Sequence, residues 1–243
     1  ACASSTIALG QAAGWIARGH AEVVLVCGAD LVTDFVVKGV TAWNALSPAP
    51  GRPLDLLRRG LGLGEGAAAM VLMSPARARR EGCGKLAGIS GWGAAGDAVH
   101  MTAPDRYGRG LTRAVRSAMA MAGVAPAAVS VVNAHGTGTV YNDMMELIVF
   151  KHIFEEKPLN LFSVKGALGH TLGAAGIIEA ALSIKGLAEQ AVPPTVGCQE
   201  PEAAARAWIK QTPQTVAHDL TISTNSGFGG INAAVILTKE EAE

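Results

Sequence analysis

The sequence lacks the patterns that mark zinc proteins, membrane-spanning proteins and proteins with a strong overall charge. Its four cysteines stand far apart with no C-x-x-C pair, and its six histidines form no H-E-x-x-H motif, so neither residue type predicts a metal site. The 20 basic and 20 acidic side chains cancel, which excludes a global attraction to nucleic acid or anionic lipid. The longest apolar stretch, residues 172 to 188, is interrupted by Glu179 and Lys185, and the first residues carry no basic leader. The expectation is a soluble protein in a reducing, cytoplasmic setting.

Short apolar runs alternate with helical segments along the chain. Residues 22 to 30, EVVLVCGAD, form a valine-rich run between Gly19 and an acidic turn, which is typical of a buried strand in an α/β protein. Strands that alternate with helices predict a mainly parallel sheet covered on both faces. The other predicted strands are 130 to 134, 159 to 164, 220 to 225 and 233 to 237, and the predicted helices are 110 to 122, 142 to 154 and 171 to 188.

One sequence pattern occurs twice. GEGAAAMVL at 64 to 72 and GGINAAVIL at 229 to 237 both lead from glycines into a small, apolar strand. Each copy follows a reactive residue, which is Cys2 in the first and His170 in the second. Only the second copy has further strand and helix units before it, so the pattern predicts a duplicated α/β core whose first half has lost its beginning. The predicted division is residues 1–80 for the N-terminal half and 81–243 for the C-terminal half.

The cysteine at position 2 directly precedes a helical run that ends at Gly19. At the start of a helix, unpaired backbone N–H groups and the positive end of the helix dipole stabilise a thiolate and lower its pKa, as a nucleophile requires. The alternative is an ordinary small residue at the start of a helix, and Cys2 taken alone favours that alternative.

Two histidines stand where α/β proteins collect functional groups. VVNAHGTGT places His135 just beyond the end of a strand. SVKGALGHTLGAAG repeats this arrangement, with Lys165 leaving a strand and His170 at the start of a helix, a position that favours the neutral imidazole. Either histidine alone is more often a loop residue with satisfied hydrogen bonds. One cysteine and two histidines at equivalent strand-to-helix edges are harder to explain together as unrelated structural residues.

The glycine-rich turns do not predict a nucleotide site. TNSGFGGIN, at 224 to 232, contains Phe228 and leads into a strand, and no Gly-Lys-Ser/Thr follows it. GLGEGA at 62 to 67 fits G-x-G-x-x-A, yet the strand-like AAMVLM after it offers no helix N-terminus to a pyrophosphate. Such turns are consistent with backbone packed closely around a narrow acyl or pantetheine passage, and ordinary tight turns are the alternative for each one.

Taken in order, Cys2, NAHGTGT, VKGALGHTLGAAG and NSGFGG resemble the elongating Cys-His-His class of the β-ketoacyl-[acyl-carrier-protein] synthases, in the thiolase-like superfamily. The resemblance covers nearly the whole chain and includes the connecting segments RPLD, GLGLGEGA, DAVHMTAP and AVPPT. It implies an α/β thiolase-like fold, a duplicated βαβαβαββ core in layers α-β-α-β-α, with the first half truncated at its N-terminus. One departure is that NSGFGG is one residue shorter than the family's usual NSFGFGG.

The resemblance implies a decarboxylative Claisen condensation that lengthens a fatty acid or polyketide by two carbons. Cys2 would accept the acyl group, while His135 and His170 would hold the malonyl thioester carbonyl. Decarboxylation builds negative charge on that thioester oxygen, and two neutral N–H donors fixed there stabilise the enolate more than the ground state. The implied reaction requires no metal and no redox cofactor, because the substrates ride on the phosphopantetheine arm of an acyl carrier protein.

The resemblance also implies supporting roles. Lys165 would pair with Glu146, and Phe228 would be a gate beside the nucleophile. Backbone N–H groups of Cys2 and Phe228 would form the oxyanion hole. The implied substrate-binding residues are Thr102, Thr137 and Thr139, which would contact the pantetheine arm, together with Gly229.

The implied partners are an acyl carrier protein and a second copy of the chain in a homodimer, with no nucleic acid and no membrane insertion. An acidic carrier protein could meet either of two arginine-rich sets, although such sets are usually no more than a solvated face. The first set is Arg77, Arg79, Arg80 and Lys85, and the second is Arg106, Arg109, Arg113 and Arg116.

The sequence leaves two other functional interpretations open. A non-catalytic subunit of the chain-length-factor type would share the fold, but such subunits lack the nucleophilic cysteine that this chain retains as Cys2. A thiolase would need a second catalytic cysteine in the C-terminal half, where Cys198 is predicted to lie in a surface loop.

Overall fold

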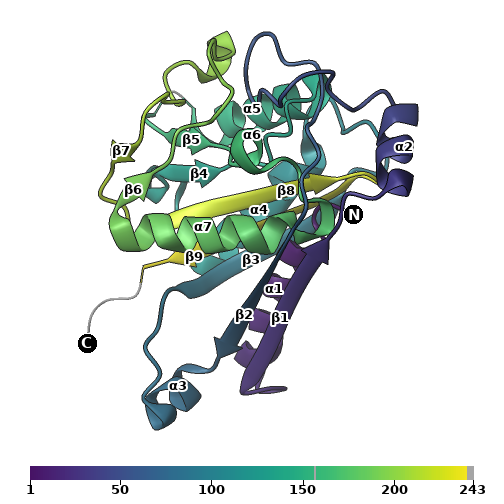
Figure 1. Ribbon diagram of the computed structural model, residues 1–243. Helices are drawn as coiled ribbons and strands as arrows, with labels where there is room; N and C mark the ends of the chain where they lie inside the picture. The colour runs from purple at the N-terminus through teal and green to yellow at the C-terminus, as the bar shows by residue number, and fades with distance from the viewer. Residues whose placement is uncertain (156, 240–243) are drawn as a thin grey trace.

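The structure, a computed structural model, describes residues 1–155 and 157–239 (Figure 1). Each predicted helix is present with its ends within two residues, except that the segment predicted at 171 to 188 begins as a 3-10 turn and is α-helical only from residue 175. The helices at 34–42, 75–81 and 165–168 were not predicted. The helices are α1 (Ser4–Ala17), α2 (Asp34–Ala42), α3 (Pro75–Glu81), α4 (Arg109–Ala122), α5 (Val140–Phe154), α6 (Lys165–Leu168) and α7 (Ala175–Glu189), with 3-10 turns η1 (Pro126–Ala128), η2 (Leu172–Ala174) and η3 (Ala203–Ala205).

The predicted strands are all present. The strands are β1 (Val23–Asp30), β2 (Gly66–Met73), β3 (Gly88–Gly96), β4 (Val131–Asn133), β5 (Asn160–Phe162), β6 (Ala191–Val192), β7 (Gln214–Thr215), β8 (Leu220–Gly227) and β9 (Ile231–Thr238). They form one five-stranded sheet in the order β3-β9-β8-β4-β5 and two two-stranded sheets, β1-β2 and β6-β7.

The expectation of a mainly parallel sheet is wrong. In the five-stranded sheet β4 runs parallel to β5 and β8, whereas β9 runs antiparallel to β3 and β8. The reason is the connection between strands. A parallel pair needs a long crossover, which α5 supplies between β4 and β5, while residues 228 to 230 join β8 directly to β9 and so form an antiparallel hairpin.

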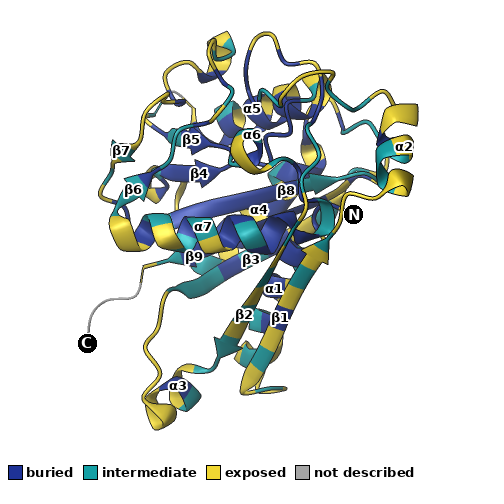
Figure 2. Cartoon of the chain, viewed as in Figure 1, coloured by how far each residue is buried: buried dark blue, intermediate teal, exposed yellow. Residues whose placement is uncertain are grey.

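The elements stack as four layers. Helices α1 and α7 lie between the β1-β2 sheet and the five-stranded sheet, and α4 covers the other face of the five-stranded sheet with α5 beside it (Figure 1). This order of sheet, helices, sheet and helices accounts for four of the five layers that the thiolase-like fold implies. The outer face of the β1-β2 sheet carries exposed apolar side chains, including Val23, Leu25 and Val71 (Figure 2).

The helices form where their apolar residues repeat with the helical period. In α4, Leu111, Ala114, Val115 and Ala118 follow one another at three- and four-residue spacing and are all fully buried. The helix ends at Gly123, which adopts the left-handed conformation (φ 66°) that terminates helices without steric cost. Within the described residues, none of the helices is long and apolar enough to cross a bilayer.

The parallel strands of the five-stranded sheet bring three chain segments to one edge. The carboxyl end of β4 leads to His135, that of β5 to Lys165 and that of β8 to Phe228. Because β4 runs parallel to both β5 and β8, these segments leave the sheet on the same side. The N-terminus, with Cys2 in front of α1, lies at this edge, since a Cβ added at Gly227 would come 3.0 Å from the backbone nitrogen of Cys2.

Candidate active site

A cavity of about 1090 Å³ opens at the carboxyl edge of the sheet. Four of the predicted catalytic residues line it, from both predicted halves of the chain. Three of the predicted substrate-binding threonines line it as well. The residues concerned are Cys2, His135, His170 and Phe228, together with Thr102, Thr137 and Thr139.

Cys2 is buried and lies two residues before Ser4, where α1 begins. Burial raises the pKa of its thiol above the ordinary value, and the nearby Lys165 ammonium and hydrogen bonds from the backbone N–H groups of Phe228 and Cys2 only partly offset this. The expectation of a lowered pKa is therefore wrong, because desolvation outweighs the favourable dipoles. The two backbone donors at the sulfur are the ones that the resemblance assigns to an oxyanion hole.

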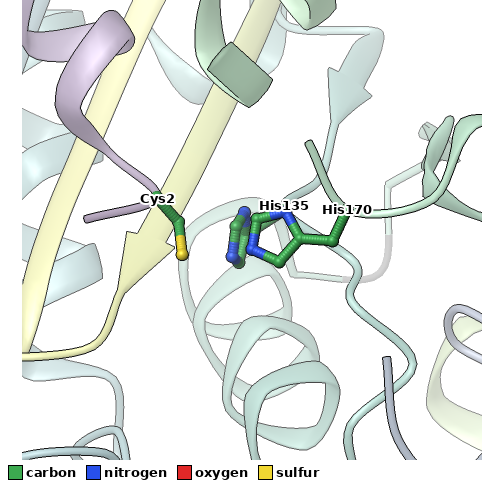
Figure 3. A group of neighbouring side chains, drawn as sticks. All are labelled: Cys2, His135 and His170. Atoms are coloured by element: carbon green, nitrogen blue, oxygen red, sulfur yellow. The ribbon is translucent and has the colours of Figure 1, made fainter. Parts of the chain in front are cut away.

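The two histidines converge on the thiol (Figure 3). Their ring centroids are 5.1 Å apart with an interplanar angle of 83°, and one ligand atom from each of Cys2, His135 and His170 lies within 4.8 Å of the others. Burial lowers the pKa of both imidazoles well below the usual value, and the positive charge of Lys165 adds to this. Both rings are neutral at physiological pH, as donors to a developing oxyanion must be.

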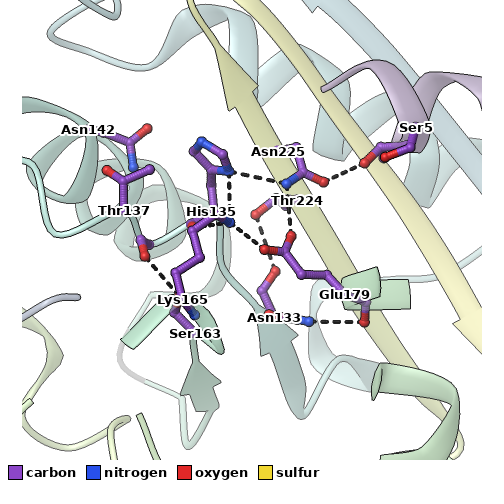
Figure 4. Close-up of polar contacts among 12 residues, drawn as sticks. Ser5, Asn133, His135, Thr137, Asn142, Ser163, Lys165, Glu179, Thr224 and Asn225 are labelled. Carbon is purple, nitrogen blue, oxygen red and sulfur yellow. Dashed lines mark hydrogen bonds and ion pairs between the residues drawn. The ribbon is translucent and has the colours of Figure 1, made fainter. Parts of the chain in front are cut away.

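Hydrogen bonds fix the proton of His135 on one nitrogen. Its Nδ1 lies 3.1 Å from Asn225 Nδ2 and 3.2 Å from Lys165 Nζ, both of which can only donate (Figure 4). Nδ1 must therefore accept, which leaves the proton on Nε2. The distances among Cys2, His135 and His170 would suit a small metal ion. An imidazole binds a metal through a lone pair, however, and in this tautomer of His135 the Nδ1 lone pair already accepts hydrogen bonds while Nε2 carries the proton.

His170 is held differently from His135. Its backbone N–H donates to the carbonyl of Gly62 at 2.7 Å, and its carbonyl accepts from the N–H of Gly64 at 3.1 Å, so the GLGLGEGA segment fixes its position. Its Nδ1 is buried and has no hydrogen-bond partner among the described residues. The hydrogen bonds around His170 therefore do not select one tautomer, in contrast to those of His135.

The predicted pairing of Lys165 with Glu146 is wrong. The Lys165 ammonium forms a buried ion pair with Glu179 on α7 and also donates to the carbonyl oxygen of His135 at 2.6 Å. Both side chains of the pair are only 2% exposed. Glu179 also accepts from Asn225 at 2.8 Å, so Lys165, Asn225 and Glu179 form one network behind His135 (Figure 4).

Glu146 instead organises the HGTGT loop from α5. Its carboxylate accepts the backbone N–H groups of His135 and Gly136, each at 2.7 Å. Asp143, one turn earlier, accepts those of Thr137 at 3.0 Å and Gly138 at 3.1 Å. Burial and the adjacent Asp143 charge raise the pKa of Glu146 to about 8, although the N–H donors oppose this. Glu146 is thus a support for the loop that carries His135.

The remaining predicted residues are placed as follows. Phe228 occupies the first position of the β8-β9 loop and faces the cavity. Thr137 and Thr139 share a hydroxyl hydrogen bond of 2.9 Å, whereas Thr102 belongs to a separate loop. Gly229 is not among the residues that line the cavity; its N–H donates to the carbonyl of Met101 at 2.6 Å.

Two members of the network, Glu179 and Asn225, were not predicted, and Cys198 was predicted in the wrong environment. Glu179 was visible as a charge inside an otherwise apolar helix, which should have suggested a buried partner, and Asn225 stands within the TNSGFGGIN segment. Cys198 does not lie in a surface loop: it is 4% exposed, and burial raises the pKa of its thiol to about 12. Cys198 is not one of the described residues that line the cavity, so it does not supply this site with a second cysteine.

Comparison with known families matches most of the chain to one group of enzymes. The N-terminal domain of the β-ketoacyl synthases matches residues 1–78, and their C-terminal domain matches residues 86–199. The 3-oxoacyl-[acyl-carrier-protein] synthase 2 of Staphylococcus aureus strain COL is 37% identical over 254 aligned residues, which cover 100% of this chain and 61% of the relative. The chain thus spans about three fifths of the length of this relative.

Solved structures agree with the family matches. A type II polyketide acyl-carrier protein in complex with its ketosynthase, bound to the hexaketide, superposes with a TM-score of 0.95 at 26% identity, over 99% of this chain and 62% of that one. A β-ketoacyl synthase from Burkholderia phymatum STM815 gives 0.93 at 33% identity, over 99% and 60%. The described four layers are therefore part of a thiolase-like fold.

Proposed function

Because the chain belongs to the β-ketoacyl synthases of the thiolase-like superfamily, we propose that it condenses an acyl group on Cys2 with malonyl-[acyl-carrier protein]. The observation that carries this proposal is that one thiol and two neutral imidazoles lie within 4.8 Å of one another in a single cavity. The product is a β-ketoacyl chain two carbons longer, destined for a fatty acid or a polyketide.

In the first half-reaction Cys2 becomes acylated. Its sulfur forms a bond to the acyl carbonyl carbon, the bond from that carbon to the pantetheine sulfur breaks, and the Cys2 proton ends on the departing pantetheine thiol. Exchange of one thioester for another keeps the acyl group activated. The backbone N–H groups of Cys2 and Phe228, which already bond to the thiol, donate to the oxyanion of the tetrahedral intermediate.

In the second half-reaction malonyl loses carbon dioxide. The electron pair of the broken carbon–carbon bond moves into an enolate, whose oxygen accepts from Nε2–H of His135 and from an N–H of His170. The enolate carbon then attacks the acyl carbonyl on Cys2, the bond from that carbonyl carbon to the Cys2 sulfur breaks, and the released thiolate takes up a proton from solvent. Lys165 and Asn225 act on this step through His135, since both donate to its Nδ1 and so keep the proton on Nε2.

The partners follow from the same assignment. An acyl carrier protein delivers both substrates on its phosphopantetheine arm, which runs past Thr102, Thr137 and Thr139 in the cavity. No metal and no redox cofactor take part. We further propose a homodimer in the cytoplasm as the working form. A non-catalytic, chain-length-factor role is disfavoured because Cys2, His135, Lys165 and His170 are all retained.

Intact-mass measurement after mixing the protein with acyl-carrier-protein thioesters tests the proposal. We expect one covalent acyl adduct on the wild type, none on Cys2→Ser, and an unchanged adduct on Cys27→Ser, which removes another cysteine of the same cavity. Absence of the adduct from the wild type with both short and long acyl thioesters would contradict an acyltransferase function. An adduct that persists in Cys2→Ser would contradict the choice of nucleophile.

A further inference from the structure

One side of the cavity is formed by α2, a helix that contains none of the predicted site residues. Phe35, Gly39 and Trp43 follow at four-residue spacing, so they share one helical face, and all three line the cavity that contains Cys2. Two aromatic side chains therefore flank a glycine on the wall of the cavity. Trp43 stands at the C-terminal end of α2, where its side chain is 55% exposed.

The Trp43 ring contacts the Phe228 ring. Their centroids are 5.0 Å apart and the interplanar angle is 88°, the edge-to-face geometry that aromatic pairs prefer. The two residues come from different parts of the chain, since Trp43 follows α2 and Phe228 belongs to the β8-β9 loop. The pair thus joins two walls of the cavity beside the nucleophile.

The backbone under Phe228 is anchored on its C-terminal side. Gly229 donates to the carbonyl of Met101 at 2.6 Å, and the carbonyl of Gly230 accepts from the N–H of Asp97 at 2.7 Å. Both glycines have positive φ, 87° and 73°, which suits the tight turn into β9. Since the loop backbone is anchored, the orientation of the Phe228 side chain depends on what its ring touches.

We infer that Trp43 is a specificity-determining residue that holds the Phe228 ring beside Cys2 and so restricts the access of bulky groups to the thiol. The contact must break or slide when a bulky acyl group enters, and a slender group passes without this cost. That the entering group is an acyl chain rests on the proposed function; the control of access to Cys2 does not.

Alkylation of Cys2 tests the control of access without any enzymatic assay. Rates with small iodoacetamide and bulky N-phenylmaleimide are measured on the Cys2 peptide by mass spectrometry, and their ratio reports access by size. We expect Trp43→Ala to raise the bulky-to-small ratio about 2- to 10-fold, the factor equivalent to losing one aromatic pair. Trp43→Phe, which keeps an aromatic ring, should change the ratio less than Trp43→Ala does.

Trp15→Ala is the matched control, because Trp15 is similarly exposed at 47% but lies on α1 away from the cavity lining. An equal ratio in Trp43→Ala and Trp15→Ala would overturn the inference, and so would a Trp43→Phe ratio as high as that of Trp43→Ala. A raised ratio in a protein that forms no acyl-Cys2 would refute the proposed function while the access role of Trp43 stands. With an acylating wild type, Trp43→Ala should accelerate transfer of branched acyl groups more than of linear short ones.

Discussion

β2 and β9 have nearly the same sequence pattern and lie in opposite environments. Both strands lie in the repeated pattern that leads from glycines into small and apolar residues, GEGAAAMVL for β2 and GGINAAVIL for β9. Ile236 of β9 is nevertheless 0% exposed, while Val71, at the equivalent place in β2, is 61% exposed. β9 has helices on both faces, whereas β2 meets α1 and α7 on one face only. Burial is therefore decided by the neighbouring layers, and the repeat alone could not distinguish the two strands.

The ion pairs beside the five-stranded sheet and beside the β1-β2 sheet also differ in their exposure to solvent. Lys165 and Glu179 pair in the fully covered region beside the five-stranded sheet, where both side chains are 2% exposed. Arg80 and Glu22 pair beside the β1-β2 sheet, where they are 54% and 56% exposed. Water screens the second pair and is excluded from the first, so the two ion pairs differ in how much they contribute to stability.

The largest expected effect comes from breaking the buried pair. Lys165→Met leaves the Glu179 carboxylate without its cation, and we expect the free energy of unfolding to fall by about 3–5 kcal/mol. Arg80→Met, the exposed counterpart, should cost less than about 1 kcal/mol. Urea denaturation of each variant measures both values.

A double variant separates the charge from the packing. Lys165→Met with Glu179→Gln removes both charges, so it should recover part of the stability that Lys165→Met loses. Losses of the same size for Lys165→Met and Arg80→Met would show that the two regions do not differ in solvent screening as their exposure indicates.

The next largest effect on stability is expected from truncating equivalent side chains in β9 and β2. Ile236→Ala removes buried methyl groups and leaves a cavity, and we expect a loss of about 2–5 kcal/mol in the free energy of unfolding. Val71→Ala removes methyl groups that already face solvent, and we expect a change within about 0.5 kcal/mol. Urea titration at fixed protein concentration compares the two variants.

The effect of Val71→Ala shows whether the outer face of the β1-β2 sheet is open in solution. A small effect agrees with an open outer face on the β1-β2 sheet. A loss comparable to that of Ile236→Ala would mean that another layer covers this face in solution, and the loss should then vary with protein concentration if a second copy supplies that layer.

Local sequence patterns predicted the strands and helices named in the sequence analysis. What they did not predict was which distant segments pair with one another. The valine-rich run at 22 to 30 and the α4 segment were found because period and turn residues are local properties. The direction of β9 was missed because the alternation of strands and helices was applied to the whole sheet, although the short glycine-containing connection at 228 to 230 signals a hairpin. Glu146 was taken as the partner of Lys165 from a resemblance, and the real partner, Glu179, lies on a different helix.

In the candidate site, too, local features were predicted from the sequence and long-range contacts were not. His135 and His170 were identified because strand ends and glycines mark them in the sequence, and Cys2 because it precedes a helical run; the structure brings the three together. The pKa direction of Cys2 was missed because a helix start is visible in a sequence while the depth of burial is not. The Trp43 contact with Phe228 joins residues 185 positions apart in sequence, and no local signal marks it.

The smallest expected effect tests whether the two regions also differ in their docking surfaces. On α3, beside the β1-β2 sheet, Arg77 pairs with Glu81 and Arg80 with Glu22, so acidic neighbours already offset much of that charge. On α4, Arg113 donates to the carbonyl of Gly96 at 2.5 Å and Arg116 contacts His152 at 3.1 Å; both arginines are exposed.

Gly96 immediately precedes the loop in which Asp97, His100 and Thr102 line the cavity, so α4 presents its charge beside the rim through which a carrier arm would enter. We therefore expect Arg113→Glu with Arg116→Glu to weaken acyl-carrier-protein binding about 3- to 10-fold at low salt and less at high salt, because screening removes the interaction it tests. Arg79→Glu with Arg80→Glu on α3 is the control and should change binding less. Fluorescence anisotropy of a labelled carrier protein measures both, and equal affinities of the α4 variant and the wild type at low salt would assign docking to another surface.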